Sequence, residues 1–114
     1  MNAVDRLWRA RRSGEWDSIA AQLRPGVRIH LMHEDRELGR DEFVALLRLL
    51  HHDATTSVER SVRGRGLEIA VVATVKRADR TLLCSGIYEL REGLIEVIEE
   101  TWVVRGAGQI LDQL

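Results

Sequence analysis

The sequence has 114 residues, a length typical of one domain and too short for two. Its 17 basic and 18 acidic side chains give a net charge of -1, which excludes a strongly basic nucleic-acid-binding protein and a highly charged disordered chain. The lone cysteine, Cys84, allows no intrachain disulfide, which favours a cytoplasmic protein. The first residues lack the apolar stretch of a signal peptide, and the longest apolar run, residues 70–75, is far too short to span a bilayer.

Two helices are predicted at the start of the chain, over about residues 3–12 and 15–23. In the second, apolar side chains recur at the i, i+3, i+4, i+7 spacing of one helix face: Trp16, Ile19, Ala20 and Leu23. The first has a basic side that we expect to be solvated, formed by Arg6, Arg9, Arg11 and Arg12. Pro25 and Gly26 end the second helix.

A strand and a third helix are predicted next. Residues 27–32 alternate apolar and polar side chains, the pattern of a half-buried strand. A polar loop over residues 33–39 leads to a helix that begins near Asp41, and His51 and His52 at its end are placed to cap the last carbonyl groups. Its apolar face repeats with the same helical spacing: Phe43, Leu46, Leu47 and Leu50.

The second half of the chain is predicted to be strands. They cover about residues 58–63, 67–76, 81–90 and 94–105, with turns between them. The order α-α-β-α-β-β-β-β indicates an α+β protein. Both faces of the strand over residues 67–76 carry apolar side chains. Because the helices cover only one face of such a sheet, we expect a second copy of the chain to cover the other and form a homodimer.

Four short motifs accompany this order: Ser-Gly-Glu-Trp-Asp at residues 13–17, Pro-Gly-Val-Arg-Ile-His at 25–30, Gly-Arg-Asp-Glu-Phe at 39–43, and Arg-Glu-Gly-Leu-Ile followed by Glu-Thr-Trp-Val at 91–103. With them, residues 3–105 resemble the SnoaL-like branch of the nuclear-transport-factor-2-like (NTF2-like) superfamily. The resemblance implies a single domain over residues 1–114, folded as a cone in which a curved, mostly antiparallel sheet wraps around the helices and encloses a pocket.

The resemblance does not define the activity, because the superfamily holds ketosteroid isomerase, polyketide cyclases, limonene epoxide hydrolase and many non-catalytic binding or dimerisation domains. Aligned with the isomerase pattern, the general-base aspartate falls on Leu31, the oxyanion-hole aspartate on Gly86 and the oxyanion-hole tyrosine on Leu7. The histidine and aspartate of the cyclases on the late strands are also missing. We therefore do not expect isomerisation by that mechanism.

Glu100, Tyr88 and His33 are the candidate catalytic residues. Glu100 shares a face of the last strand with Trp102, which the resemblance places in the pocket wall, so an inward carboxylate would have a raised pKa suited to a general base. The alternatives are a solvated strand end or a pair with an arginine. Tyr88 is either a hydrogen-bond donor to a ligand or part of the core. His33 is either an acid or base at the pocket mouth or a partly exposed residue.

The candidate ligand-binding residues share the faces that the resemblance turns toward the pocket: Trp8, Leu31, Gly86, Ile98 and Trp102. Trp8 belongs either to the core or to the pocket edge, and Gly86 either enlarges the pocket or marks a strand bend. We expect Cys84 to be buried and inert. The spacing of His30 and His33 on an extended chain is poor for one metal ion, and no cofactor motif is present.

Two functions remain open. The first is an enzyme that acts on an apolar metabolite with a carbonyl or epoxide group by acid–base chemistry without a cofactor. The second is a non-catalytic domain for ligand binding or dimerisation. The missing family acids favour the second, and an inward Glu100 would favour the first.

Overall fold

The computed structural model describes residues 1–105, and residues 106–114 of the expected domain lie outside the described part. Within residues 1–105 the helices are α1 (Ala3–Ser13), α2 (Trp16–Ala21), α3 (Arg40–Leu50) and the 3-10 turn η1 (Met32–Glu34). The strands are β1 (Leu23–Leu31), β2 (Arg36–Leu38), β3 (Thr55–Arg63), β4 (Glu68–Lys76), β5 (Thr81–Arg91) and β6 (Leu94–Arg105). They form one sheet in the order β2-β1-β6-β5-β4-β3, in which β1 and β6 run parallel and the other neighbours antiparallel.

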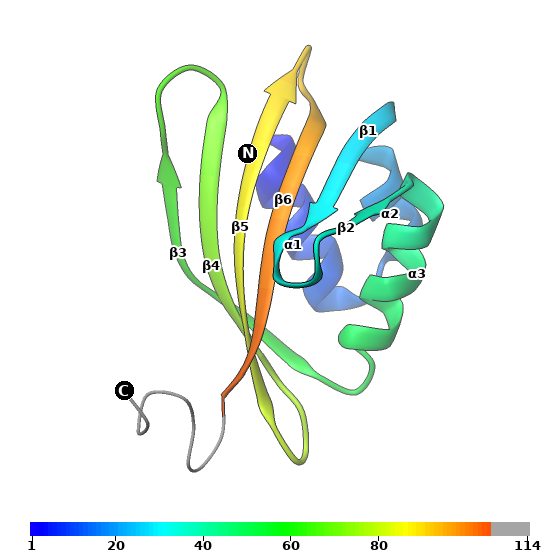
Figure 1. Cartoon of the computed structure of the whole chain (residues 1–114), viewed down its shortest axis with the longest axis vertical. Helices are drawn as coiled ribbons and strands as arrows, with labels where there is room; N and C mark the ends of the chain where they lie inside the picture. Colours follow the sequence, from blue (N-terminus) through cyan, green and yellow to red (C-terminus); the bar gives the residue numbers. More distant parts are fainter. Residues whose placement is uncertain (106–114) are drawn as a thin grey trace.

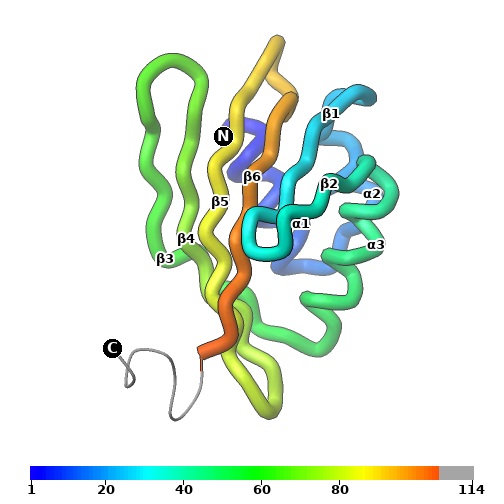
Figure 2. Tube along the Cα trace, viewed as in Figure 1, coloured from blue at the N-terminus to red at the C-terminus, as the bar shows by residue number. Residues whose placement is uncertain are grey.

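The helices cover one face of the curved sheet, which we call the inner face (Figures 1 and 2). Helix α1 contacts β3 and β6, and α3 contacts β1. The sheet is not closed, because β2 and β3 are its two edges. The predicted α+β cone is thus confirmed. None of the helices within residues 1–105 has the length and apolar character that crossing a membrane requires.

Helix α1 has well-defined ends that fix which side faces the sheet. Asn2 and Asp5 form a reciprocal capping box at its start, with bonds of 2.9 and 3.2 Å between side chain and backbone N–H. Gly14 ends the helix with φ 74°, a left-handed conformation that glycine adopts without strain. Between these ends, Val4, Leu7, Trp8 and also Arg11 are buried.

Strand β1 and the segment after it differ from the prediction. Strand β1 begins at Leu23, four residues before the expected start, and it contains Pro25. The proline is tolerated because the pairing of β1 with β6 is interrupted between Leu23 and Arg28. The predicted polar loop overlaps η1, which begins at Met32, and contains β2, whose three residues pair with the edge of β1. So short a strand has no apolar alternation by which the sequence would reveal it.

The register of the central strands brings the site candidates together. Gly86 on β5 lies opposite Glu100 on β6, Tyr88 lies opposite Ile98, and Leu31 on β1 pairs with Glu100 from the other side. A register shift opposite Glu89 and Leu90 changes the alternation near the start of β6. Beyond this shift, Ile98, Glu100 and Trp102 are buried on the inner face.

Candidate functional site

A cluster of polar side chains is buried between the sheet and the helices. We call it the buried polar cluster, and its members are Arg11, His51, Thr56, Tyr88, Glu100 and Trp102. Each of them is at most 9% exposed. Polar groups at such depth must find hydrogen-bond partners, because none is available from solvent. The members of the cluster satisfy one another across α1, α3, β3, β5 and β6.

Glu100 is the centre of the cluster. Its Oε2 accepts hydrogen bonds from Arg11 Nη1 at 2.6 Å and from the Tyr88 hydroxyl at 2.6 Å. Its Oε1 accepts one from Trp102 Nε1 at 3.0 Å and a longer one from Arg11 Nη2 at 3.4 Å. The side chain is fully buried. Of the alternatives that the sequence left open, the structure therefore has Glu100 pointing inward and paired with an arginine.

The pKa of Glu100 is set by two opposing effects. Burial alone would raise it, but the charge of Arg11 and the hydrogen bonds from Arg11, Tyr88 and Trp102 outweigh burial and hold the pKa below its ordinary value. The raised pKa that we expected for an inward Glu100 is thus wrong, because that argument left out Arg11. Burial and the charge of Glu100 raise the pKa of Tyr88, so its hydroxyl keeps its proton and donates a hydrogen bond to the carboxylate.

His51 extends the cluster toward the start of β3. Arg11 Nε donates to His51 Nε2 at 3.1 Å, so this nitrogen carries no proton. The proton is on Nδ1, which donates to Thr56 Oγ1 at 2.8 Å. Burial and the nearby charge of Arg11 lower the pKa of His51 to about 3, so the ring is neutral. The expectation that this ring caps helix α3 is wrong, since both ring nitrogens are bonded within the cluster.

Arg11 is the member of the buried polar cluster that sequence reasoning placed wrongly. We expected it on a solvated basic side, but it is 1% exposed and its guanidinium lies 3.7 Å from the centre of the Trp8 ring. A signal was present, because Val4, Leu7, Trp8 and Arg11 follow the i, i+3, i+4, i+7 spacing of one helix face. A guanidinium that is buried on such a face needs an opposite charge or hydrogen-bond acceptors as partners.

Gly86 makes the contact between Tyr88 and Glu100 possible. Both Gly86 and Tyr88 face inward on β5, and Glu100 lies directly opposite Gly86. A Cβ atom on residue 86 would lie 2.2 Å from the Tyr88 hydroxyl and 2.6 Å from the ring carbon that bears it. The tyrosine side chain therefore lies over the glycine to reach the carboxylate. Of the two alternatives for Gly86, a larger pocket is contradicted, because Tyr88 fills the space beside the glycine.

The remaining predicted residues lie around the cluster. Leu31 is buried beside Glu100, and Ile98 is buried beside Tyr88. Both are apolar neighbours of the buried polar cluster. His33 lies on η1, where its Nδ1 accepts a hydrogen bond of 3.2 Å from the backbone N–H of Trp102. It is not bonded to Glu100 or Tyr88. Cys84 is a buried free thiol. No group of three or more His, Cys, Asp and Glu side chains able to hold a metal ion occurs within residues 1–105.

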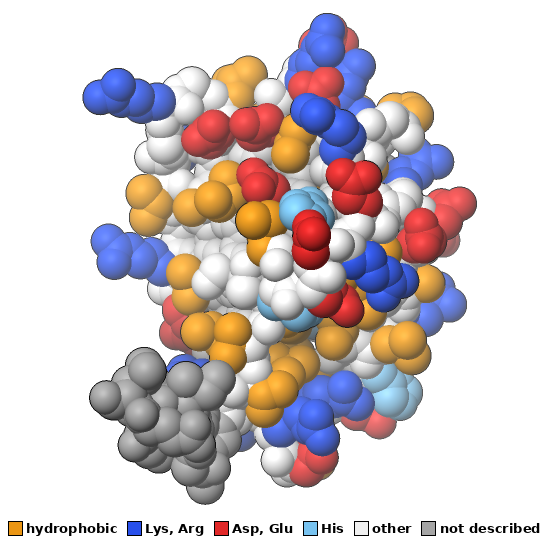
Figure 3. Space-filling view, viewed as in Figure 1, with side chains coloured by type: hydrophobic (Ala, Val, Ile, Leu, Met, Phe, Trp, Pro, Cys, Tyr) orange, Lys and Arg blue, Asp and Glu red, His pale blue; other side chains and the backbone are white. Residues whose placement is uncertain are grey.

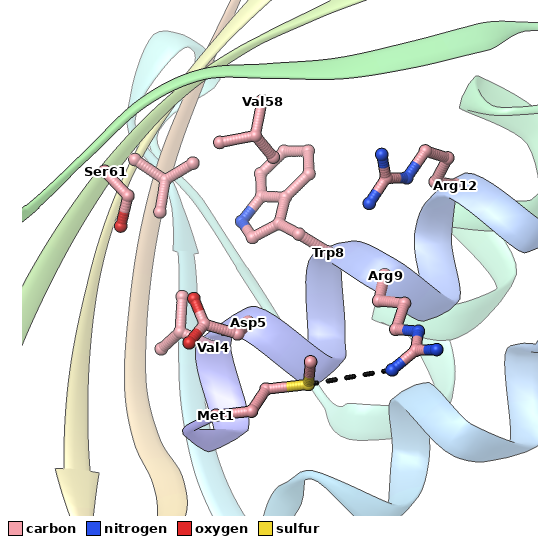
Figure 4. A pocket seen from close by; sticks show the side chains of 9 residues that line it. Met1, Val4, Asp5, Trp8, Arg9, Arg12, Val58 and Ser61 are labelled. Carbon is pink, nitrogen blue, oxygen red and sulfur yellow. Dashed lines mark hydrogen bonds between the residues drawn. The ribbon is translucent and has the colours of Figure 1, made fainter.

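An open groove of about 380 Å³ lies between α1 and the strands β3 and β4 (Figure 4). Its lining residues come from these elements and the chain start: Met1, Val4, Asp5, Trp8, Arg9, Arg12, Val58, Ser61 and Val71. Trp8 belongs to this lining and also packs on Arg11 of the cluster. The groove is therefore separated from Glu100 by a layer of side chains.

Comparison with known proteins supports the fold. The sequence matches no protein-family model and no curated protein. Among solved structures, a candidate ketosteroid isomerase from Kribbella flavida DSM 17836 is 19% identical with a TM-score of 0.80, covering 94% of this chain and 79% of its own. An NTF-2 like protein of unknown function from Burkholderia xenovorans LB400 is 18% identical with a TM-score of 0.78, covering 97% and 88%. A LEH-like epoxide hydrolase from M. tuberculosis is 15% identical with a TM-score of 0.68, covering 89% and 80%. The chain thus has the NTF2-like fold.

Proposed function

We propose that the chain is a small-molecule-binding domain that does not use Glu100 as a catalytic base. The observation that carries the proposal is the bonding of Glu100, whose two oxygens accept from Arg11, Tyr88 and Trp102. A general base needs a lone pair within reach of the substrate and a pKa near the working pH. Glu100 has a lowered pKa and is fully buried. The open groove, by contrast, has the size of a ligand pocket.

The test combines binding with turnover. We expect apolar ketones and epoxides to shift amide resonances of the nitrogen-15-labelled protein and to remain chemically unchanged during long incubation. Glu100→Gln should leave this result unaltered wherever the variant is folded. The matched control is Glu99→Gln, the neighbouring carboxylate on the other side of β6. Conversion of a compound by the wild-type chain and by Glu99→Gln, but not by Glu100→Gln, would contradict the proposal.

The second candidate is an acid–base enzyme in which Glu100, Tyr88 and His33 act on a carbonyl- or epoxide-bearing metabolite. A cluster of buried ionisable groups with perturbed pKa values favours it, since such clusters concentrate at active sites. It requires Arg11 to move away from Glu100 when substrate enters. The incubation described above decides between the two candidates, because only the acid–base enzyme would convert the added ketone or epoxide.

We also propose that two copies of the chain associate through the outer face of the sheet, which is the face opposite the helices. Val62, Ile87 and Val103 are 46%, 47% and 41% exposed, and Figure 3 shows hydrophobic side chains spread over this face. A hollow of about 300 Å³ beside Met32 and Ile87 provides a concave surface into which side chains of the partner copy can pack. Exposed apolar patches of this kind mark interaction sites.

Sedimentation tests the association. We expect a dimer at micromolar concentration and dissociation of the dimer by Ile87→Glu, which places a charge on the outer face. Leu49→Glu is the matched control, because Leu49 is 70% exposed on α3, away from that face. A monomeric wild-type chain, or equal effects of the two variants, would refute the dimer.

A further inference from the structure

The groove between α1 and β3–β4 combines an apolar floor with two cationic side chains. Met1 and Val58 supply the exposed apolar surface, and the buried side chains of Val4, Trp8 and Val71 lie beneath it. Arg9 and Arg12 project from α1 at the same groove, as Figure 4 shows. Within residues 1–105 neither arginine forms an ion pair with a carboxylate. Guanidinium groups of this kind are suited to bind a carboxylate from outside the chain.

The indole N–H of Trp8 is a second polar feature of the groove. The Trp8 side chain is 3% exposed, and its Nε1 is buried without a hydrogen-bond partner in the described part of the chain. Figure 4 shows this nitrogen on the edge of the ring that is turned toward Ser61 and away from Arg9 and Arg12. A buried donor without a partner is costly and rare in native structures. An acceptor oxygen on a ligand would remove that cost.

Asp5 is the one acid in the lining of this groove, and its position orients the ligand. Its Oδ2 accepts a hydrogen bond of 3.2 Å from the backbone N–H of Asn2, so the carboxylate is held at the N-terminal end of α1. An anionic group is disfavoured beside Asp5 and favoured beside Arg9 and Arg12. A neutral oxygen is suited to the Trp8 N–H, on the other side of the ring.

We infer that the groove binds an apolar carboxylic acid that carries a second, neutral acceptor oxygen such as a ketone. The carboxylate lies against Arg9 and Arg12, and the apolar body lies along the groove. The ketone oxygen accepts from Trp8 Nε1 after the side chains that bury this nitrogen move aside. Met1, 74% exposed with an unbranched side chain, rearranges around the ligand. The inference rests on the proposed function, because it names the class of ligand and the place where it binds.

The experiment is a titration of the nitrogen-15-labelled chain with three matched probes. They are 4-oxo-4-phenylbutanoate, 4-phenylbutanoate, which lacks the ketone, and the methyl ester of the first, which lacks the charge. We expect the keto acid to bind roughly fivefold more tightly than 4-phenylbutanoate, the effect of one hydrogen bond. It should also move the indole N–H resonance of Trp8, identified by its loss in Trp8→Phe.

Two variants test the roles of the side chains. Trp8→Phe keeps an aromatic ring and should abolish the preference for the keto acid, whereas Trp16→Phe, outside the groove, should retain it. Arg12→Gln should weaken both acids about threefold, as expected for an exposed ion pair, without changing the ester.

Three results would overturn the inference. They are equal binding of the acid and its ester, no binding of any probe at millimolar concentration, and shifts confined to residues outside the groove. In the last case the chain still binds a small molecule, so the proposed function stands while the site falls. Conversion of a probe that depends on Glu100 would instead refute the proposed function.

Discussion

The variant Arg11→Met removes the positive charge that is paired with Glu100 and leaves a carboxylate buried among neutral groups. Glu100 loses its contacts to Arg11 at 2.6 and 3.4 Å, and it keeps its hydrogen bonds from Tyr88 and Trp102. Removing one partner of a buried ion pair costs about 3–5 kcal/mol. Because two donors remain on the carboxylate, we expect the free energy of unfolding at neutral pH to fall by about 3 kcal/mol.

The size of this loss depends on pH. In the wild-type chain the pKa of Glu100 lies below its ordinary value of 4.5. The stability that the ionised carboxylate contributes is therefore present above pH 4.5 and is lost as the pH falls through the folded-state pKa. In Arg11→Met no cation opposes burial, so the pKa of Glu100 rises above the unfolded value. The variant then loses stability as the pH rises. The difference between the two proteins is largest at neutral pH and shrinks toward about pH 4.

Urea unfolding followed by tryptophan fluorescence at both pH values measures this difference. Arg12→Met is the control, since Arg12 is exposed on the same helix and should change stability by at most about 0.5 kcal/mol. Adding Glu100→Gln to Arg11→Met removes the unpaired charge and should recover part of the loss, so the two changes are not additive. A cost below about 1 kcal/mol at neutral pH, or the same cost at both pH values, would refute the reasoning.

Three further predictions concern the same cluster. Gly86→Ala should lower the free energy of unfolding by about 2 kcal/mol, because its Cβ would lie 2.2 Å from the Tyr88 hydroxyl. Urea unfolding in a Tyr88→Val background should show a smaller cost, and an equal cost would contradict the contact. Tyr88→Phe should cost about 2 kcal/mol and raise the pKa of Glu100, measured by carbon-13 NMR; an unchanged pKa would exclude this hydrogen bond. The pKa of His51 is about 3 in the folded state and 6.5 in the unfolded state. The stability that the neutral ring contributes is therefore fully present above pH 6.5 and is lost as the pH falls from 6.5 toward 3. Over this range the free energy of unfolding changes by up to about 1.4 kcal/mol per pH unit. His51→Gln should reduce this pH dependence of the free energy of unfolding, measured with urea, and His52→Gln at the exposed neighbour should not. The same pH dependence in both variants would show that another group than His51 causes it.

Short-range patterns in the sequence were sufficient to predict most of the fold. The apolar spacing of Phe43 and Leu47 predicted the buried face of α3, and the strand-forming residues between the turns predicted β4 to β6. These patterns are readable because a helix or strand repeats its buried side at a fixed interval. The short β2 was missed, since its three residues pair only with the edge of β1.

The sequence alone thus determined the order of elements apart from η1 and β2, the α+β class, and the suggestion that Glu100 shares a face with Trp102. Only the tertiary structure decided what Glu100 does there. Its partner Arg11 is 89 positions away along the chain, and no local pattern joins the two. Likewise, the contact of Tyr88 with Glu100 across Gly86 depends on the register of β5 and β6. Local periodicity reports which side of an element is buried, whereas the charge state of a buried carboxylate depends on groups that only folding brings within a few ångströms.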